Sequence, residues 1–374
     1  MAFMGRKRLT SVIIPNSVTK IGERAFDECE SLSEITLPNG IVELSPSTFR
    51  LCKKLKSIKL SDGLRAIGDA AFYGCTRLSS IEIPEATTVL GSYSFTNCKS
   101  IRTLRLHNGI STIGHYAFAG CKALESIEIP DSVERFGRGV FSTCSALREA
   151  KLPKGLSEIP EATFKSCSSL ENVTLGDGIT RIGSLAFYMC SSLCDLELPT
   201  TVRRIEDRAF DCASIKNFRL GDKIRYIGSH AVPKDVRYVY IPNTDCEIHR
   251  DAFEKGTAFF IPCHLSHIPE RLLTNAMVGY TVALDNGYTP DKSTDADYYR
   301  LWREPSRAYP HNFDAAFPAL ARQIVKYLAF KRLITVVQAD YLLKHYEKDA
   351  EIVSIVVDYK ANVLGGNDVE DLLL

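Results

Sequence analysis

Four residues in the second half of the chain have the types and the spacing of a metal site. Cys246 and His249 form a C-x-x-H pair, and thirteen residues further on Cys263 and His267 form a C-x-x-x-H pair. Two thiolates and two imidazoles suit a tetrahedral zinc ion. The competing interpretation, which we favour, is that Cys263 and His267 simply face solvent, because the sequence pattern around both pairs is irregular. We therefore predict no metal and no cofactor.

Most of the other cysteines follow a strict period. Eight of them are each 23 residues from the next, and a phenylalanine precedes each by three positions. The cysteines are Cys29, Cys52, Cys75, Cys98, Cys121, Cys144, Cys167 and Cys190, and the phenylalanines are Phe26, Phe49, Phe72, Phe95, Phe118, Phe141, Phe164 and Phe187. Disulfides between adjacent coils are one interpretation, since stacked strands bring Cα atoms to about 5 Å. We favour free, buried thiols that act as small hydrophobic side chains, which suits a reducing compartment.

The 23-residue unit predicts the elements that position these side chains. Its template is L-x-x-I-x-I-P-x-x-V-x-x-I-G-x-x-A-F-x-x-C-x-x. The segment L-x-x-I-x-I alternates like a short strand with one buried face, and the proline ends it. We expect the glycine to allow a bend and A-F-x-x-C to form a helical or 3₁₀ turn. A tandem period of this length is typical of a solenoid, in which stacked coils share one core.

The period divides the chain into three predicted regions. Residues 1–8 precede the first coil, residues 9–268 form an α/β repeat solenoid of about eleven coils with parallel strands on one curved face, and residues 269–374 form a small all-α domain. In the last region the hydrophobic pattern predicts helices over 270–284, 296–303, 313–332, 338–346 and 351–359. The first coil has an open edge. Either residues 1–8 or another chain is expected to cover it, the latter by self-association.

The template resembles the BspA-like class of leucine-rich repeat. The resemblance is carried by stretches such as Ile81-Glu82-Ile83-Pro84 and Ile113-Gly114-His115-Tyr116-Ala117-Phe118, and it keeps a fixed phase over residues 9 to about 268. It implies a curved right-handed solenoid that binds other macromolecules, often at bacterial or protist cell surfaces. The N-terminus has no secretory h-region, so the sequence as written predicts a cytoplasmic protein. A cell-surface or secreted location is the alternative if a leader was removed.

Exposed positions of the predicted strands form a column of charged residues. The last x of L-x-x-I-x-I is Lys59, Glu82, Arg105, Glu128 and Lys151 in five successive coils, so the sign alternates strictly. On parallel strands these side chains are direct neighbours. The interpretation that we favour is a cross-strand ladder of ion pairs. The alternative is a charge-patterned groove that binds a ligand.

Further along the chain the same face changes to aromatic residues and arginines. These are Arg219, Arg237, Tyr238, Tyr240 and Phe260. Aromatic residues and Arg are enriched at binding hot spots, and an exposed apolar patch usually marks a contact. The competing interpretation is that the C-terminal helices fold back over these residues as an intramolecular cap.

Composition and motifs exclude several classes of function. The 374 residues include 46 basic and 45 acidic side chains, so the charge balance favours neither nucleic acid nor an anionic membrane surface. No apolar run reaches the roughly 18 residues of a membrane span. The sequence contains no phosphate-binding loop, dinucleotide fingerprint, H-E-x-x-H or G-x-S-x-G motif. An enzyme with its site in residues 270–374 is therefore the least favoured hypothesis.

Taken with the resemblance, these features predict a scaffold that binds another protein on the exposed strand face of the solenoid. The charge column and the aromatic cluster are the candidate binding residues. Two alternatives remain: a self-assembling structural protein, and a carbohydrate-binding repeat protein, since aromatic side chains serve sugars too.

Overall fold

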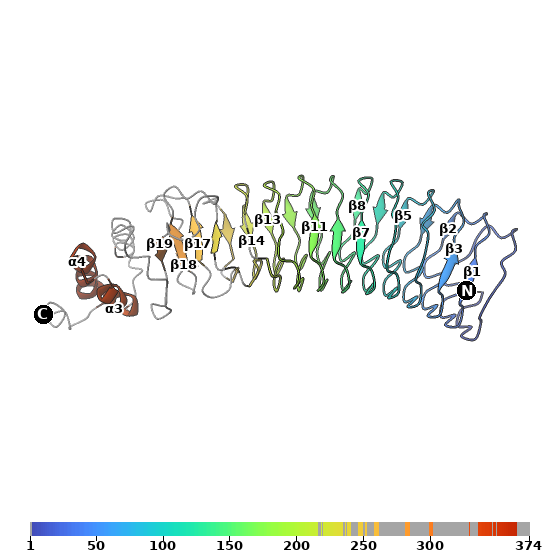
Figure 1. The fold of residues 1–374 in the computed structure, drawn as a ribbon, viewed down its shortest axis with the longest axis horizontal. Coiled ribbons are helices and arrows are strands. Elements are labelled where there is room, and N and C mark those ends of the chain that lie inside the picture. The colour runs from blue at the N-terminus through green and yellow to red at the C-terminus, as the bar shows by residue number, and fades with distance from the viewer. Residues whose placement is uncertain are drawn as a thin grey trace. The chain divides into compact units, whose positions relative to one another are not determined.

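The chain divides into two compact units in the computed structural model, Met1–Val236 and Arg237–Leu374. The structure describes residues 2–215, 218, 220–234 and 236 of the first unit. In the second it describes residues 238–240, 246–249, 251–252, 258–261, 281–284, 299–301, 329, 336–345, 347–348 and 350–364. The first unit is a parallel-strand solenoid of about nine turns, and Figure 1 shows its coils stacked in a single row. The predicted repeat solenoid is confirmed, with about nine turns where about eleven coils were expected.

The strands of the first unit lie on two faces of the solenoid. The long strands come from the L-x-x-I-x-I segment and are β1 (Glu34–Thr36), β3 (Ser57–Lys59), β7 (Ser126–Glu128), β9 (Glu149–Lys151) and β11 (Asn172–Thr174). In each, the two outer residues are exposed and the middle residue is buried or half-buried. This is the pattern expected when successive side chains point to opposite faces.

The short strands come from the V-x-x-I-G segment on the other face. They are β2 (Glu43–Leu44), β4 (Ala66–Ile67), β5 (Val89–Leu90), β6 (Thr112–Ile113), β8 (Arg135–Phe136), β10 (Glu158–Ile159), β12 (Arg181–Ile182), β13 (Arg204–Ile205) and β14 (Tyr226–Ile227). β2, β4, β5, β6 and β8 are consecutive neighbours in one parallel sheet, and β10, β12, β13 and β14 are consecutive neighbours in another. Residues at equivalent positions of successive repeats are register partners, so that Ala66 pairs with Val89.

The periodic phenylalanines form a continuous stack inside the solenoid. Ten rings from Phe3 to Phe210 make nine stacked pairs, with ring centroids 5.1–5.8 Å apart. Each coil thus buries an aromatic side chain against its two neighbours. A coil alone would leave this surface in water, so the stacking of coils supplies the hydrophobic stabilisation.

The eight periodic cysteines, which we call the thiol stripe, run beside the phenylalanine stack and are fully buried and free. The Sγ of each donates to the carbonyl of the phenylalanine 26 residues earlier, at 3.0–3.3 Å. Cys121, for example, donates to Phe95. The prediction of free, buried thiols is confirmed. The structure adds a reason for cysteine at this position, because its S–H is a weak donor that a carbon side chain would lack.

The segment A-F-x-x-C is not helical, so that prediction is wrong. It forms successive turns with two left-handed residues, as at Arg24 (φ 56°) and Glu28 (φ 60°) of the first full coil. Ala25 and Cys29 N–H close these turns by donating three residues back, at 3.2 and 3.1 Å. Phe26 N–H instead donates to Thr48 of the next coil at 2.9 Å. In a helix, all of these N–H groups would donate to carbonyls of the same coil. In these turns, every second N–H donates to a carbonyl of the neighbouring coil and joins the two coils.

The glycine of the template has a different role from the one predicted. Gly114 does not have a positive φ, but a Cβ there would lie 2.4 Å from the backbone nitrogen of Ser92 in the preceding coil. The equivalent Gly22 has no atom within 4 Å of its Cβ position. Glycine is therefore needed because adjacent coils approach closely, and not because the backbone bends.

Residues 2–8 continue the stack by a further half coil. The Phe3 ring stacks on Phe26 with centroids 5.2 Å apart, and Phe3 N–H donates to the Ala25 carbonyl at 2.8 Å. This segment covers the core of the first coil, which was one of the two expectations. Self-association through the N-terminal edge is not tested by these contacts and stays a prediction.

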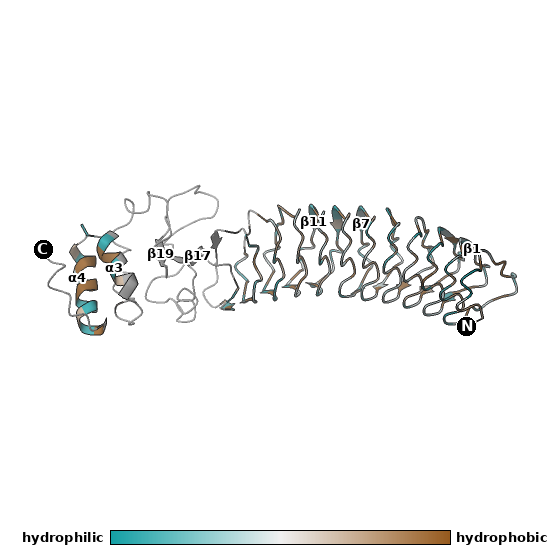
Figure 2. Cartoon of the chain, turned by 90° about the horizontal axis from the view of Figure 1, so that it is seen from below, coloured by the Kyte–Doolittle hydropathy of each residue, from teal (hydrophilic) through white to brown (hydrophobic). Residues whose placement is uncertain are grey.

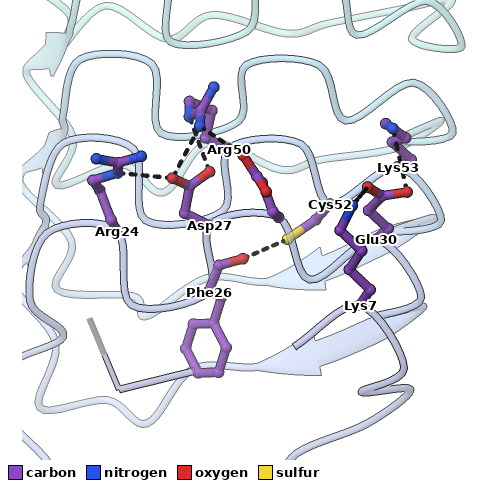
Figure 3. A network of polar contacts seen from close by, with 9 residues as sticks. Lys7, Arg24, Phe26, Asp27, Glu30, Arg50, Cys52 and Lys53 are labelled. Carbon is purple, nitrogen blue, oxygen red and sulfur yellow. Dashed lines mark hydrogen bonds and ion pairs between the residues drawn. The ribbon is translucent and has the colours of Figure 1, made fainter. Parts of the chain in front are cut away.

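A network of charged side chains ties the first coils together (Figure 3). Asp27 is fully buried, and its carboxylate lies 2.8 Å from Nε of Arg24 and 2.9 Å from Nε of Arg50 in the next coil. Glu30 lies 3.2 Å from the ammonium groups of both Lys53 and Lys7, and these hydrogen bonds lower the pKa of Glu30. A buried carboxylate requires such partners, because an isolated buried charge is costly.

The second unit contains short strands and a helical pair. Its strands are β15 (Tyr238–Tyr240), β16 (Glu247–Ile248), β17 (Ala258–Ile261), β18 (Thr281–Leu284) and β19 (Tyr299–Leu301). β15, β17 and β18 are parallel neighbours, and β19 is antiparallel to β18. The helices predicted over 270–284 and 296–303 are therefore wrong where β18 and β19 lie. Apolar runs of this length do not distinguish a strand from a helix.

The last two predicted helices are confirmed with small shifts in their ends. They are α3 (Val336–His345) and α4 (Ala350–Tyr359), and a π-helical turn, Lys360–Leu364, follows α4. Ala339 of α3 packs with the buried Ile352, Val356 and Tyr359 of α4, and most of α4 is coloured hydrophobic in Figure 2. The helix predicted over 313–332 lies outside the described residues, apart from the helical Ala329. The domain boundaries at residues 8 and 268 stay predictions.

Candidate binding surface

The long-strand face is interrupted in the middle of the first unit. On this face β1 pairs with β3, and β9 pairs with both β7 and β11, but no described long strand lies between β3 and β7. A single isolated bridge, Ser57 to Ser80, is formed there. On the other face β4, β5, β6 and β8 remain paired through the same coils. We call the interrupted part, residues 57–60, 80–85, 103–108 and 126–130, the open section.

Backbone hydrogen bonds that join coils elsewhere are missing in the open section. Leu37 N–H donates to the Lys59 carbonyl, and Ile129 N–H to the Lys151 carbonyl, both at 2.9 Å. The equivalent N–H groups of the open section make no backbone hydrogen bond within the described part of the chain; they belong to Leu60, Ile83 and Leu106. The carbonyls that would accept from them, those of Glu82, Arg105 and Glu128, likewise accept no such bond there. The long-strand face therefore carries both backbone N–H donors and carbonyl acceptors that make no backbone hydrogen bond within the described residues.

Two grooves lie along the open section. The wider has a volume of about 800 Å³ and is lined by the apolar Ile58, Ile81 and Ile83 and by polar and charged residues that include Lys59 and Glu82. The second, of about 400 Å³, lies between Arg105 and Glu128 and their neighbours in sequence. Volumes of about 300–1,000 Å³ are typical of ligand sites. The charge column thus runs over the rims of two grooves.

The predicted ion ladder forms in only one place. Glu128 and Lys151, on the paired strands β7 and β9, are 2.5 Å apart, and this hydrogen bond raises the pKa of Lys151. Lys59, Glu82 and Arg105 are exposed and make no ion pair within the described residues. The ladder prediction is therefore wrong across the open section, because the strands that would have held neighbouring charges together are unpaired.

Two pairs of charged side chains flank the open section. On the long-strand face Arg102 lies 2.9 Å from Glu125, and Arg148 lies 3.2 Å from Glu171. Each pair joins consecutive coils, as a cross-strand pair should. Exposed charges that make no ion pair within the described residues also occur on other long strands, at Glu34 and Glu149, so the open section is distinguished by three of them in one column over the grooves.

His107 is a residue of this surface that sequence reasoning missed. It lines the wider groove, its side chain is 6% exposed, and Gly109 N–H donates to its Nδ1 at 3.0 Å. Nε2 is buried and has no hydrogen-bond partner among the described residues. A signal was available in the sequence, because His107 occupies the template position that is proline in neighbouring coils, at Pro84 and Pro130.

The predicted aromatic and arginine cluster lies mostly beyond what the structure describes. Arg219 and Arg237 are outside the described residues. Tyr238 and Tyr240 lie on β15 and Phe260 on β17, where Tyr240 and Phe260 are register partners. Their side chains are not described, so both the binding role and the cap stay predictions.

Only two of the four candidate metal ligands, Cys246 and His249, lie within the described residues. Cys263 and His267 lie outside them, and no cluster of three or more metal-ligating side chains occurs in the part that the structure covers. Cys246 is buried, and His249 Nδ1 accepts from Asp251 N–H at 3.1 Å. The thiol stripe offers no nucleophile either. Burial raises the pKa of every stripe thiol, for Cys144 and Cys190 to about 12, so the thiolate is not formed near neutral pH.

The repeat identifies the family. The chain matches the model of the BspA type leucine rich repeat region in six copies, over residues 1–125, 66–194 and 111–235. This protein belongs to the BspA-type leucine-rich repeat family. Leucine-rich repeat proteins are in general scaffolds for binding. None of the helices in the described part of the chain has the length and apolar character needed to cross a bilayer.

Solved structures of bacterial leucine-rich repeat proteins are similar to this chain. A leucine-rich repeat protein from Bacteroides ovatus is 26% identical, with 68% of this chain and 92% of that chain covered and a TM-score of 0.32. The T. pallidum leucine-rich repeat protein is 27% identical over 50% and 78% of the two chains, with a TM-score of 0.37. A leucine-rich cell surface protein from Faecalibacterium prausnitzii is 22% identical over 75% and 88%, with a TM-score of 0.42. No curated protein matches the chain.

Proposed function

We propose that this BspA-type repeat protein is a scaffold that binds another protein through the open section of its long-strand face. The observation that carries the proposal is the set of three exposed, unpaired charges, Lys59, Glu82 and Arg105, at the interruption of the strand ladder. Other charges on this face form pairs within the chain, as at Arg148 and Glu171. A partner with the opposite pattern supplies the missing counter-charges.

The surface suits recognition for two physical reasons. The coils are held by the buried phenylalanine stack and by the short-strand sheet, so the charges of the open section lie on a rigid base and little entropy is lost on docking. Alternating signs also reject partners with a uniform charge, because each like-charge contact is repulsive. Affinity then comes from the grooves, and selectivity comes from the order of charges along the column.

The test compares two sets of charge-removing variants. The first is the triple variant Lys59→Ala, Glu82→Ala and Arg105→Ala; the matched control is Arg148→Ala with Glu171→Ala, which removes a neutralised pair from the same face. A partner captured from an extract of the source organism is identified and purified, and its affinity for each protein is measured. We expect the triple variant to weaken binding about tenfold or more, with little change in the control.

Salt supplies a second readout. Because the three charges are exposed, added salt should weaken wild-type binding and have less effect on the triple variant. Equal loss in control and triple variant would contradict the proposal. Retention by the triple variant with loss in Tyr238→Ala/Tyr240→Ala would move the binding site to the aromatic cluster.

A further inference from the structure

We propose that the wider groove of the open section takes an extended peptide segment of the partner and recognises its main chain. In this arrangement, the His107 Nε2–H donates to one of the segment's carbonyl oxygens. The inference rests on the proposed function and deepens it, since it names the form in which the partner enters the site. Its support comes from three independent features: the open backbone groups, the buried imidazole and the order of the charges.

The open backbone groups match the main chain of an extended segment. Leu60, Ile83 and Leu106 present N–H donors without a backbone acceptor in the described residues, and the Glu82 and Arg105 carbonyls present acceptors. A peptide main chain carries both kinds of group on every residue except proline. Extended segments that bind to unpaired strands use these groups for affinity. A ligand with donors alone or acceptors alone would leave half of the groove unsatisfied.

The imidazole of His107 supplies a buried donor at the wall of the groove. Nδ1 accepts from Gly109 N–H at 3.0 Å, and the Glu85 carboxylate lies 3.5 Å from the same atom. With Nδ1 as the acceptor, a neutral ring carries its proton on Nε2. The ring also lies close to the Gly109 backbone, since a Cβ on Gly109 would come within 2.9 Å of it. Nε2 is buried without a hydrogen-bond partner among the described residues, and a buried donor without an acceptor is destabilising. A carbonyl oxygen in the groove removes this cost.

The charges select an extended segment with alternating signs. Lys59, Glu82 and Arg105 follow one another on successive coils, so a segment that crosses the coils meets positive, negative and positive side chains in turn. In an extended chain alternate residues share one face. A repeat of Glu-Thr-Lys-Thr therefore presents acidic and basic side chains alternately on one face, and its threonines favour the extended form.

The experiment uses this synthetic peptide and the full-length protein. Affinity is measured for the Glu-Thr-Lys-Thr repeat and for the same sequence with N-methylated threonines, which keeps every charged side chain but removes main-chain donors. We expect the N-methylated peptide to bind at least about tenfold more weakly. In ¹⁵N spectra of protein labelled at histidine, the unmodified peptide should shift the Nε2 resonance of His107 and leave that of the exposed His115 unchanged.

The variant His107→Pro restores the residue that the neighbouring coils carry at this position, so it should fold. Loss of one neutral hydrogen bond predicts peptide binding about three- to tenfold weaker in this variant. His115→Ala is the control and should bind as the wild type does. Thermal unfolding of both variants confirms that the solenoid is intact.

Each contrary result has a distinct meaning. Equal affinity for the two peptides, or unchanged affinity in His107→Pro, would overturn main-chain recognition, whereas the proposed function would stand if the Lys59/Glu82/Arg105 variant still loses its partner. The inference would also be overturned if no peptide binds, or if removing glycans from the captured partner abolishes binding. If that triple variant keeps full affinity for the partner, the proposed function itself is wrong.

Discussion

Replacing Gly114 by alanine should destabilise the solenoid, although it adds a single methyl group to a residue without positive φ. The added Cβ would lie 2.4 Å from the nitrogen and 2.8 Å from the Cα of Ser92, and 2.6 Å from the carbonyl carbon of Gly91. These are backbone atoms of the preceding coil, so no flexible side chain can move aside. The phenylalanine stack holds that coil in place, with Phe95 and Phe118 centroids 5.5 Å apart.

The expected cost follows from two opposing terms. Overpacking in a close-packed interior costs about 1–3 kcal/mol, and backbone contacts place Gly114→Ala at the upper end of that range. Replacing glycine also restricts the unfolded chain, which returns about 0.4–1 kcal/mol. The net loss in free energy of unfolding is then about 2 kcal/mol, or a fall in melting temperature of about 4–8 °C for a unit of this size.

Two glycines provide matched controls. Gly22 occupies the same template position in the first full coil, and Gly155 lies in the middle of the array; neither has an atom within 4 Å of its Cβ position or a positive φ. Gly22→Ala and Gly155→Ala should therefore be neutral or slightly stabilising. Urea unfolding and thermal unfolding followed by circular dichroism measure all three variants. The reasoning is refuted if Gly114→Ala is as stable as wild type, or if Gly155→Ala is destabilised equally.

Three further predictions follow from buried and charged groups. A maleimide reagent should label the exposed Cys194 in native protein but none of the thiol stripe, because burial removes access and raises the pKa of the stripe thiols. Peptide mass spectrometry measures the labelling, and rapid labelling of the stripe without urea would contradict the fold. Asp27→Asn should cost about 1–3 kcal/mol in urea unfolding, since it leaves two arginines without their shared carboxylate; an unchanged midpoint would mean that the network contributes nothing. Because Lys53 and Lys7 lower the pKa of Glu30, the stability they give is present above the ordinary glutamate pKa and is lost as the pH falls through the lowered value. The urea midpoint of wild type should therefore fall more on acidification than that of Glu30→Gln, and parallel pH profiles would refute this sign.

The thiol stripe and the phenylalanine stack could be predicted from the sequence because they depend on the period alone. When units of equal length stack in register, residues such as Phe118 and Cys121 must recur at one place in every coil. Local conformation was harder to predict. The turns around Phe118 were expected to be helical, but Tyr116 adopts a φ of 54° there. The hydrogen bonds between coils decide this geometry, and no local pattern contains them.

The open section shows the same limit at the candidate site. The sequence placed Lys59, Glu82 and Arg105 in one column, and the column was interpreted as neutral because parallel strands make such side chains direct neighbours. Whether the strands pair at each coil is a tertiary property. His107 carried a signal as a departure from the proline column, but its unpartnered Nε2 follows only from what surrounds the ring.

By itself the sequence determined the repeat, the buried columns, the free thiols and the family, since all of these follow from residue types recurring at a fixed interval. The tertiary structure alone decided why glycine is required, where the strand ladder is interrupted and which charges remain unpaired. The physical reason is that the period fixes which residues occupy equivalent positions, whereas the approach of one coil to the next depends on the packing of all the side chains between them.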